Sequence, residues 1–143
     1  MEDEKKLKPA AKKAGMIVKA KKKNAVARAV IRKGKGVIKI NHINIKAYAK
    51  GYIKELLLEP VRLAGEAINE YDIEVNVKGS GFMSQAVAVR SCIAKALVRA
   101  KGKKLKEIFT AYDRTLLVDD VRRVESKKPL GRKARKKKQK SKR

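Results

Sequence analysis

The 143-residue sequence predicts an α+β fold, in which helices cover one face of a single β-sheet. Two observations predict it. Apolar residues follow the two-residue period of strands in some segments and the period of helices in others, with glycine-containing turns between them. The predicted order, β-β-α-β-α-β, also lacks the regular alternation of a parallel α/β sheet. The length suits one domain, and a hydrophobic content of 43% suffices for one core.

Three extended segments begin the predicted sheet. Residues 16–20 and 25–32 form the first two strands, and residues 37–40 form the third. We expect Gly34-Lys35-Gly36 to join the last two as a hairpin, because glycine tolerates the backbone angles of tight turns. Residues 41–44 are predicted to be a second short turn.

Helical spacing then begins near Tyr48 and continues to residue 68. Pro60 lacks an amide hydrogen, so the sequence predicts that this helix kinks or restarts there. Over residues 71–77, apolar residues alternate with polar ones, which is typical of a half-buried strand. Gly79-Ser80-Gly81 ends that strand.

A long helix is predicted over about 82–101, with Gly102 as its C-terminal stop. A short helix over 103–109 and a last strand over 115–118 complete the predicted fold. The inward stripe of the long helix comprises Phe82, Ala86, Val89, Ile93, Leu97 and Ala100, whereas Ser91, Lys95 and Arg99 are expected on the opposite side.

The charge of the chain indicates a polyanionic partner. Forty Lys and Arg residues outnumber 14 Asp and Glu residues, and the formal net charge is +26. Self-repulsion makes a free compact particle with this charge unfavourable, and nucleic acid is the densest polyanion that relieves it. A membrane partner is disfavoured, because the sequence has no Trp and no long apolar run.

The charges divide the chain into three parts. Residues 127–143 hold eleven basic residues and no acidic one, so we expect this tail to be disordered alone and to become ordered along phosphates. Residues 1–15 are predicted to be a flexible basic segment, and residues 16–126 are predicted to be the folded α+β domain. Within it, residues 51–74 carry six acidic residues against two basic ones, so this face should point away from the partner.

Reactive side chains are too few for an enzyme. The single cysteine, Cys92, and the single histidine, His42, cannot supply the ligands of a structural zinc site. Gly79-Ser80-Gly81 resembles the start of a dinucleotide-binding motif, but Ser84 replaces the third glycine. We therefore predict no catalytic residue, no cofactor and no metal ion. The two glycines either help to hold a backbone phosphate at the following helix or only form a tight turn.

The first predicted strands carry the basic residues that best suit nucleic acid. Arg28 and Arg32 share one strand face, and an arginine can bind a phosphate through two hydrogen bonds. Aromatic residues make up only 4% of the chain, so phosphate and sugar contacts are expected rather than stacking of bases. The cations of this region are Lys21, Lys22, Lys23, Arg28, Arg32, Lys33 and Lys35.

Several stretches together form a specific pattern. They are residues 22–28 and 34–41, Leu57-Leu58-Glu59-Pro60-Val61, Val77-Lys78-Gly79-Ser80-Gly81, residues 85–90 and 93–97, residues 112–118, Arg122-Arg123, residues 125–128, residues 132–135 and Ser141-Lys142-Arg143. In this order they resemble the S-nine family of small-ribosomal-subunit proteins in its archaeal and eukaryotic form, over nearly all of residues 16–143. Cys92 stands where many members have a small residue such as Gly, and Lys142 where many carry Tyr.

The resemblance implies a ribosomal S5 domain 2-like fold with an extended basic C-terminal tail. It also implies a cytoplasmic, non-enzymatic protein of the small-subunit head, in contact with rRNA and neighbouring head proteins. Ser141, Lys142 and Arg143 would contact the anticodon stem-loop of the peptidyl-site tRNA. The predicted rRNA contacts are the seven cations named above and Gly79, Ser80, Gly81, Gln85, Arg90, Arg122, Arg123, Lys127, Lys128, Arg132, Lys133 and Arg135.

Two other functions stay open at this point. A free architectural protein that compacts nucleic acid would explain the charge of +26 by itself. An RNA-processing enzyme, or the protein cofactor of one, would also use an RNA-binding α+β domain. The first would fractionate with the chromosome, and an enzyme would depend on a metal or acid–base cluster that the sequence does not reveal.

Overall fold

A computed structural model of the chain describes residues 15–141, and residues 1–14 and 142–143 lie outside the described part. The predicted N-terminal segment, residues 1–15, therefore lies outside it except for Gly15. The strands are β1 (Met16–Lys22), β2 (Ala25–Lys33), β3 (Ile38–Ile40), β4 (Ile43–Asn44) and β5 (Tyr71–Lys78). The helices are α1 (Ile45–Tyr48), α2 (Gly51–Ala64), α3 (Phe82–Lys101) and α4 (Lys103–Tyr112), and the 3₁₀ turns are η1 (Gly65–Glu70) and η2 (Arg114–Leu116).

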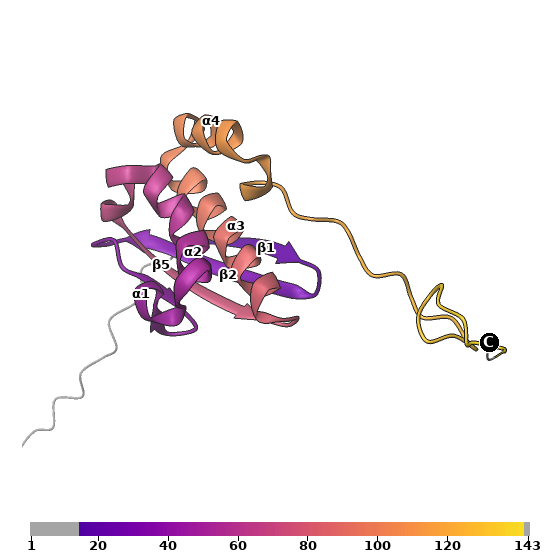
Figure 1. Ribbon diagram of the computed structural model, residues 1–143. Helices are drawn as coiled ribbons and strands as arrows, with labels where there is room; N and C mark the ends of the chain where they lie inside the picture. Colours follow the sequence, from indigo (N-terminus) through magenta and orange to yellow (C-terminus); the bar gives the residue numbers. More distant parts are fainter. Residues whose placement is uncertain (1–14, 142–143) are drawn as a thin grey trace, which may run out of the picture.

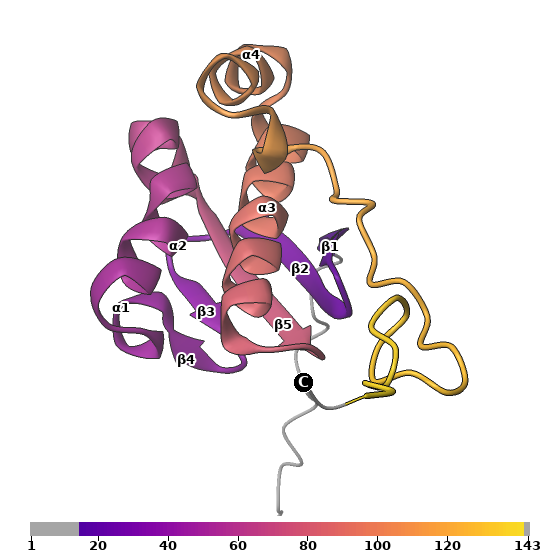
Figure 2. The same ribbon diagram turned by 45° about the vertical axis from the view of Figure 1, so that its right-hand side comes forward.

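The predicted α+β fold is confirmed. The five strands form one sheet in the order β1-β2-β5-β3-β4, and α2 and α3 lie on one of its faces (Figure 1). Burial alternates accordingly, because Ala27 and Ala29 of β2 and Val75 of β5 are fully buried, whereas Arg28 and Asn76 are exposed. Helix α4 lies beyond the C-terminal end of α3 (Figure 2). The core therefore lies between the sheet and the helices, and the other face of the sheet is open.

The hairpin predicted at Gly34-Lys35-Gly36 is wrong. Strand β2 pairs antiparallel with β1 on one side and with β5 on the other, and β3 pairs in parallel with β5. Strand β5 thus inserts between two strands that follow each other in the sequence. Two other hairpins form: β1–β2, which turns at Lys23 and Asn24, and β3–β4, which turns at Asn41 and His42 within the predicted turn at 41–44. Local turn chemistry cannot reveal the insertion of a strand from a distant part of the chain.

Pro60 lies inside α2 and does not open a new helix. A proline inside a helix removes the hydrogen bond to the carbonyl four residues earlier, here that of Leu56. Pro60 is fully buried, and burial of its ring offsets that loss. The predicted helix is divided elsewhere, because α1 ends at Tyr48 and α2 begins at Gly51.

Helix α3 is buried on more sides than the predicted stripe. The sheet, α2, α4 and η2 all contact it. Ser91, which was predicted to face outward, is therefore buried, and its hydroxyl donates a hydrogen bond to the Thr115 carbonyl at 3.2 Å. Phe82, which was predicted to face inward, is 71% exposed at the first position of the helix. The central positions Ala86 and Ile93 are buried as predicted.

Residues 115–118 do not form the predicted strand. The side chain of Asp113 accepts a hydrogen bond from the Thr115 amide at 2.8 Å, and this cap begins the 3₁₀ turn η2. Leu116 is fully buried, but Val118 is 49% exposed. The apolar run therefore anchors the end of the domain to the core, and the chain then continues without regular structure toward the tail.

The buried thiol of Cys92 predicts a loss of stability at high pH. Its Sγ lies 3.6 Å from the carbonyl oxygens of Val18 and Ala27, and burial raises its pKa from 9.0 to about 11. Between these two pH values the unfolded chain releases this proton and the folded chain keeps it. The free energy of unfolding should therefore fall by up to about 1.4 kcal/mol per pH unit, relative to Cys92→Ala. Urea unfolding at pH 8, 9 and 10 measures this difference, and parallel pH profiles would contradict it.

Candidate nucleic-acid interface

The predicted basic residues of the first strands lie at two ends of the sheet. Lys22 and Lys23 lie at the β1–β2 turn, whereas Lys33 and Lys35 lie at and just after the end of β2. The nine residues of β2 separate these ends by roughly 26 Å, since a strand rises about 3.3 Å per residue. These cations therefore form two surfaces. We call the surface at Lys22 and Lys23 the turn end and the surface at Lys33 and Lys35 the far end.

Residues 79–81, the glycine loop, belong to the turn end. Gly79 has a φ of +87°, and a Cβ atom there would lie 2.4 Å from the carbonyl oxygen of Asn24. The loop therefore touches the β1–β2 turn. The side chain of Gln85 donates a hydrogen bond to the Gly79 carbonyl at 3.1 Å. Gly81 provides no side-chain cap for α3, so amides at the start of the helix are available to an anionic oxygen.

The two glycines of this loop should respond differently to alanine. Gly79→Ala should destabilise the domain by about 2–4 kcal/mol, because Cβ would meet both an unfavourable φ and the Asn24 carbonyl. Gly81→Ala is the matched control, since a Cβ atom there would have no neighbour within 4 Å. Thermal unfolding of both variants measures the difference. Equal stability of the two variants would contradict the close approach at Gly79.

The open face of the sheet is basic toward the turn end. Arg28 of β2 lies between Lys19 of β1 and Asn76 of β5, and all three are exposed. Toward the far end, Arg32 lies opposite Asp72 instead. Both arginines lie on the exposed face of β2, as predicted. A phosphate backbone is therefore attracted most strongly near the turn end.

A carboxylate organises the loop that carries the far-end lysines. Asp72 Oδ1 accepts hydrogen bonds from the amides of Lys35 and Val37, both at 2.9 Å. The Val37 amide, followed by the Lys35 amide, lowers the pKa of Asp72. The backbone around Lys35 is thereby fixed, while the side chains of Lys33 and Lys35 remain exposed.

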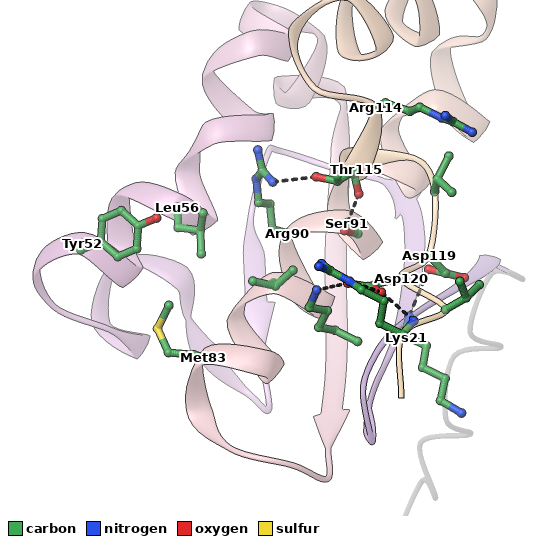
Figure 3. Close-up of a pocket in the computed structure, with 15 residues that line it drawn as sticks. Lys21, Tyr52, Leu56, Met83, Arg90, Ser91, Arg114, Thr115, Asp119 and Asp120 are labelled. Carbon is green, nitrogen blue, oxygen red and sulfur yellow. Dashed lines mark hydrogen bonds and ion pairs between the residues drawn. The ribbon is translucent and has the colours of Figure 1, made fainter. Parts of the chain in front are cut away.

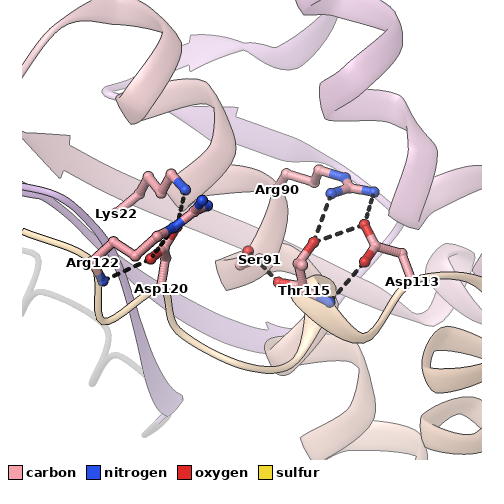
Figure 4. Close-up of polar contacts among 7 residues, drawn as sticks. All are labelled: Lys22, Arg90, Ser91, Asp113, Thr115, Asp120 and Arg122. Carbon is pink, nitrogen blue, oxygen red and sulfur yellow. Dashed lines mark hydrogen bonds and ion pairs between the residues drawn. The ribbon is translucent and has the colours of Figure 1, made fainter.

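Arg90 differs from the other predicted rRNA contacts, because it is only 7% exposed. Its guanidinium group forms ion pairs with Glu59 at 2.5 Å and with Asp113 at 2.9 Å, and Figure 4 shows the pair with Asp113. The Tyr112 hydroxyl donates a hydrogen bond to Glu59 at 2.7 Å. Burial raises the pKa of Asp113, but hydrogen bonds from Thr115 and Arg90 outweigh it and lower the pKa overall. Arg90 thus ties α3 to α2 and to the end of α4.

Two acidic residues that the sequence analysis missed hold the base of the tail. Asp120 binds the side chains of both Lys22 and Arg122 (Figure 4), and hydrogen bonds from Arg122 and then Lys22 lower its pKa. Asp119 binds Lys95 at 2.6 Å. We call Asp119 and Asp120 the acidic clamp, because they fix the chain against β1 and α3. The sequence did offer a sign of this role, because Asp119 and Asp120 are adjacent acidic residues just before a strongly basic segment.

A groove of about 640 Å³ lies beside the acidic clamp (Figure 3). Tyr52 and Leu56 of α2 and Met83 of α3 form its apolar wall, and Arg114 and Arg122 contribute cations. Among residues 15–141, no three His, Cys, Asp or Glu side chains group together as metal ligands. Likewise, none of the described helices has the length and apolar character of a membrane span.

The described part of the tail leaves the body beside β1 and extends away from it (Figures 1 and 2). Between residues 121 and 141, no residue is buried. Glu125 forms ion pairs with Arg135 at 2.9 Å and with Lys128 at 3.5 Å. Lys142 and Arg143, two of the three predicted tRNA contacts, lie outside the described residues. The other predicted contacts of the tail are exposed: Arg123, Lys127, Arg132, Lys133 and Ser141.

Known proteins identify the chain. The model of the ribosomal protein S9/S16 family matches residues 20–143. The chain belongs to this family. The family predicted from the sequence is thereby confirmed, and it is a family of ribosomal proteins and not of enzymes.

Three relatives illustrate how much of the S9 family pattern is present, and each is a small ribosomal subunit protein uS9. The protein of Methanococcus maripaludis strain C5 is 48% identical over 110 residues, which cover 76% of this chain and 82% of the relative. That of Picrophilus torridus is 48% identical over 122 residues, covering 85% and 92%. That of Thermoplasma volcanium is 46% identical over 127 residues, covering 88% and 96%.

Proposed function

We propose that the chain is a structural constituent of the small-subunit head that binds rRNA through its body and tail and contacts peptidyl-site tRNA with its last residues. The observation that carries this proposal is the turn end in a member of the S9 family. There, Lys23 precedes Asn24, which touches a glycine loop whose helix has no side-chain cap, and Arg28 lies on the open face of the sheet toward the same end. Such a surface suits the phosphate backbone of RNA.

The predicted rRNA contacts divide into two roles under this proposal. Exposed cations without a carboxylate partner among the described residues, such as Lys23, Arg28 and Arg123, bind phosphates directly. Arg90 acts as a positioning residue, because its charge is already used by Glu59 and Asp113. Lys22 and Arg122 both pair with Asp120 and so hold the base of the tail. Only those of their N–H groups that do not bind Asp120 can donate hydrogen bonds to RNA.

Under this proposal, the tail extends the RNA-binding surface beyond the folded body, toward the peptidyl-site tRNA. Its eleven cations lie in residues 127–143, and the described part of this segment, 127–141, contributes no buried residue to the core. Counterion release from rRNA then favours binding of the whole segment. The family resemblance assigns the tRNA contact to Ser141, Lys142 and Arg143, and the body lies in the head beside neighbouring proteins.

The body contact can be tested with one arginine. Arg28→Gln should lower the slope of log affinity against log salt for small-subunit rRNA by about 0.7–0.9, the value expected for one phosphate contact. Arg62→Gln is the matched control, because Arg62 is exposed on α2 and pairs with Glu55 at 2.5 Å. A slope that falls equally in both variants would contradict a specific contact at Arg28.

The tRNA contact can be tested in assembled subunits. Deletion of Ser141 to Arg143 should leave assembly intact and weaken tRNA binding in the peptidyl site. Unchanged tRNA affinity would count against the terminal contact.

Sedimentation of a cell lysate distinguishes the proposed function from a free architectural protein. The full chain should sediment with small subunits at moderate salt, whereas sedimentation with the chromosome would favour the free architectural protein.

A further inference from the structure

The far end of the molecule holds a run of cations that none of the predicted contacts includes. Residues 99–106 contain five basic residues and no acidic one. They span the last turn of α3 and the first turns of α4, and all five are exposed. We name this set the α3–α4 cluster; it comprises Arg99, Lys101, Lys103, Lys104 and Lys106.

The cluster is continuous with the far end of the sheet. Lys101 forms an ion pair with Glu70 at 2.7 Å, and its Nζ lies 5.6 Å from the centre of the Tyr71 ring. Tyr71 pairs with Lys33 across β5 and β2. Lys33 follows the alternation of Ala29 and Ile31, so it lies on the helix side of the sheet. Cations from two distant segments of the chain therefore meet around Tyr71.

Within residues 15–141, most of this charge has no carboxylate partner. In residues 15–141, ion pairs within 4 Å engage Lys22, Arg90 and Lys95, but only Lys101 of the cluster has such a partner. Lys103 and Lys104 also lie in the first turn of α4, where the helix dipole disfavours cations. The cluster therefore carries an electrostatic cost that a bound polyanion would remove.

We propose that the α3–α4 cluster, together with Lys33, is a second phosphate-binding surface for rRNA, separate from the turn end. This inference rests on the proposed function and adds a further contact to it. The twenty residues of α3 separate the two surfaces by about 30 Å, at 1.5 Å per residue. Helix α3 thus acts as a rigid spacer between two RNA contacts, and Figure 2 shows α4 at the end of α3 opposite the glycine loop.

The chemistry of the cluster favours RNA over an acidic protein. Lysine is depleted at protein–protein interfaces, where aromatic residues and arginine provide most of the anchors. Four of the five cluster residues are lysines, which suit the loosely directed contacts of a phosphate backbone. A contact with an acidic protein is therefore treated as a competing outcome of the experiment.

The experiment uses the full chain and two variants that remove equal charge. Lys103→Gln, Lys104→Gln and Lys106→Gln are combined in the first, and Lys46→Gln, Lys50→Gln and Lys54→Gln in the second. The first variant should lower the slope of log affinity against log salt for small-subunit rRNA by about 2–3, while the second keeps the slope of the unmodified chain. The cluster lysines are exposed, so the first variant should remain folded, which thermal unfolding verifies.

Each outcome decides the proposal. An unchanged slope in the cluster variant overturns it, as does an equal fall in both variants, which would report net charge alone. Loss of a neighbouring protein from subunits assembled with the cluster variant, with an unchanged slope on free rRNA, would reassign the surface to protein. If the unmodified chain binds small-subunit rRNA no better than an unrelated RNA of equal length, the proposed function itself fails.

Directed cleavage provides an independent measurement. The native thiol of Cys92 is fully buried, so an introduced surface cysteine can be labelled selectively. Iron chelates attached at Lys104→Cys and at Lys23→Cys should cleave different rRNA segments in the assembled subunit. Cleavage of the same nucleotides from both positions would contradict two separate surfaces.

Discussion

Truncation of the chain after Ser126 should weaken binding to small-subunit rRNA by orders of magnitude and make the remaining affinity much less sensitive to salt. The deleted segment carries eleven cations and no acid. At roughly 0.7 per phosphate contact, complete engagement would contribute about eight to the slope of log affinity against log salt. Within the described part of this segment, only Lys128 and Arg135 have a carboxylate partner. Filter binding between 50 and 200 mM salt measures the effect.

A scrambled tail of the same composition distinguishes charge from sequence. It should retain the salt dependence of rRNA binding, because counterion release depends on charge and not on order. It should lose the tRNA contact if that contact requires Ser141, Lys142 and Arg143 at the end of the tail. An unchanged salt slope after truncation would refute the role of the tail in rRNA binding.

Arg90→Met should reduce the free energy of unfolding by about 2–4 kcal/mol, because removal of the buried guanidinium leaves two partly buried carboxylates, those of Glu59 and Asp113, without their counter-charge. Arg90 is 7% exposed, and its ion pairs with Glu59 and Asp113 join α3 to α2 and to the residue between α4 and η2. The expected fall in the melting temperature is about 10–20 °C for a domain of this size. Calorimetry of the purified chain measures it.

Arg62→Met is the control for this substitution. Its pair with Glu55 lies on the surface of α2, where the side chains are 64% and 54% exposed. Exposed pairs contribute about 0–1 kcal/mol, so this variant should retain nearly the original melting temperature. Equal destabilisation by the two substitutions would indicate that the burial of Arg90 does not strengthen its interactions.

Sequence periodicity predicted those elements whose packing is simple. Strand β5 alternates between a buried and an open face, and α3 is long and apolar, so both could be predicted. The pairing of β5 between β2 and β3 could not, because it depends on contacts between distant segments. The strand predicted over residues 115–118 was wrong, because the apolar residues after Arg114 suit a strand but Asp113 caps a 3₁₀ turn there instead.

The sequence predicted which residues belong to the candidate interface, but not which of them are exposed and which are already paired with carboxylates. The basic residues of β2 and the glycine loop were named from the sequence, and the structure brings Lys23 close to that loop. Which cations are already paired depends on tertiary contacts. Arg90 is buried among carboxylates from α2 and η2's N-cap, and Lys22 is bound to Asp120. Charge counting treats such residues as equal to exposed ones.

The acidic clamp has a consequence for the strength of binding at the tip of the tail. It fixes the chain at Asp120, and the 23 residues that follow span at most about 80 Å when fully extended. Under the proposed function, docking of the body would confine the last residues of the tail to that volume and raise their effective concentration near peptidyl-site tRNA to roughly the millimolar range. A terminal contact with a dissociation constant below that concentration would be occupied most of the time, although it would not persist between free molecules, and it would still be released quickly.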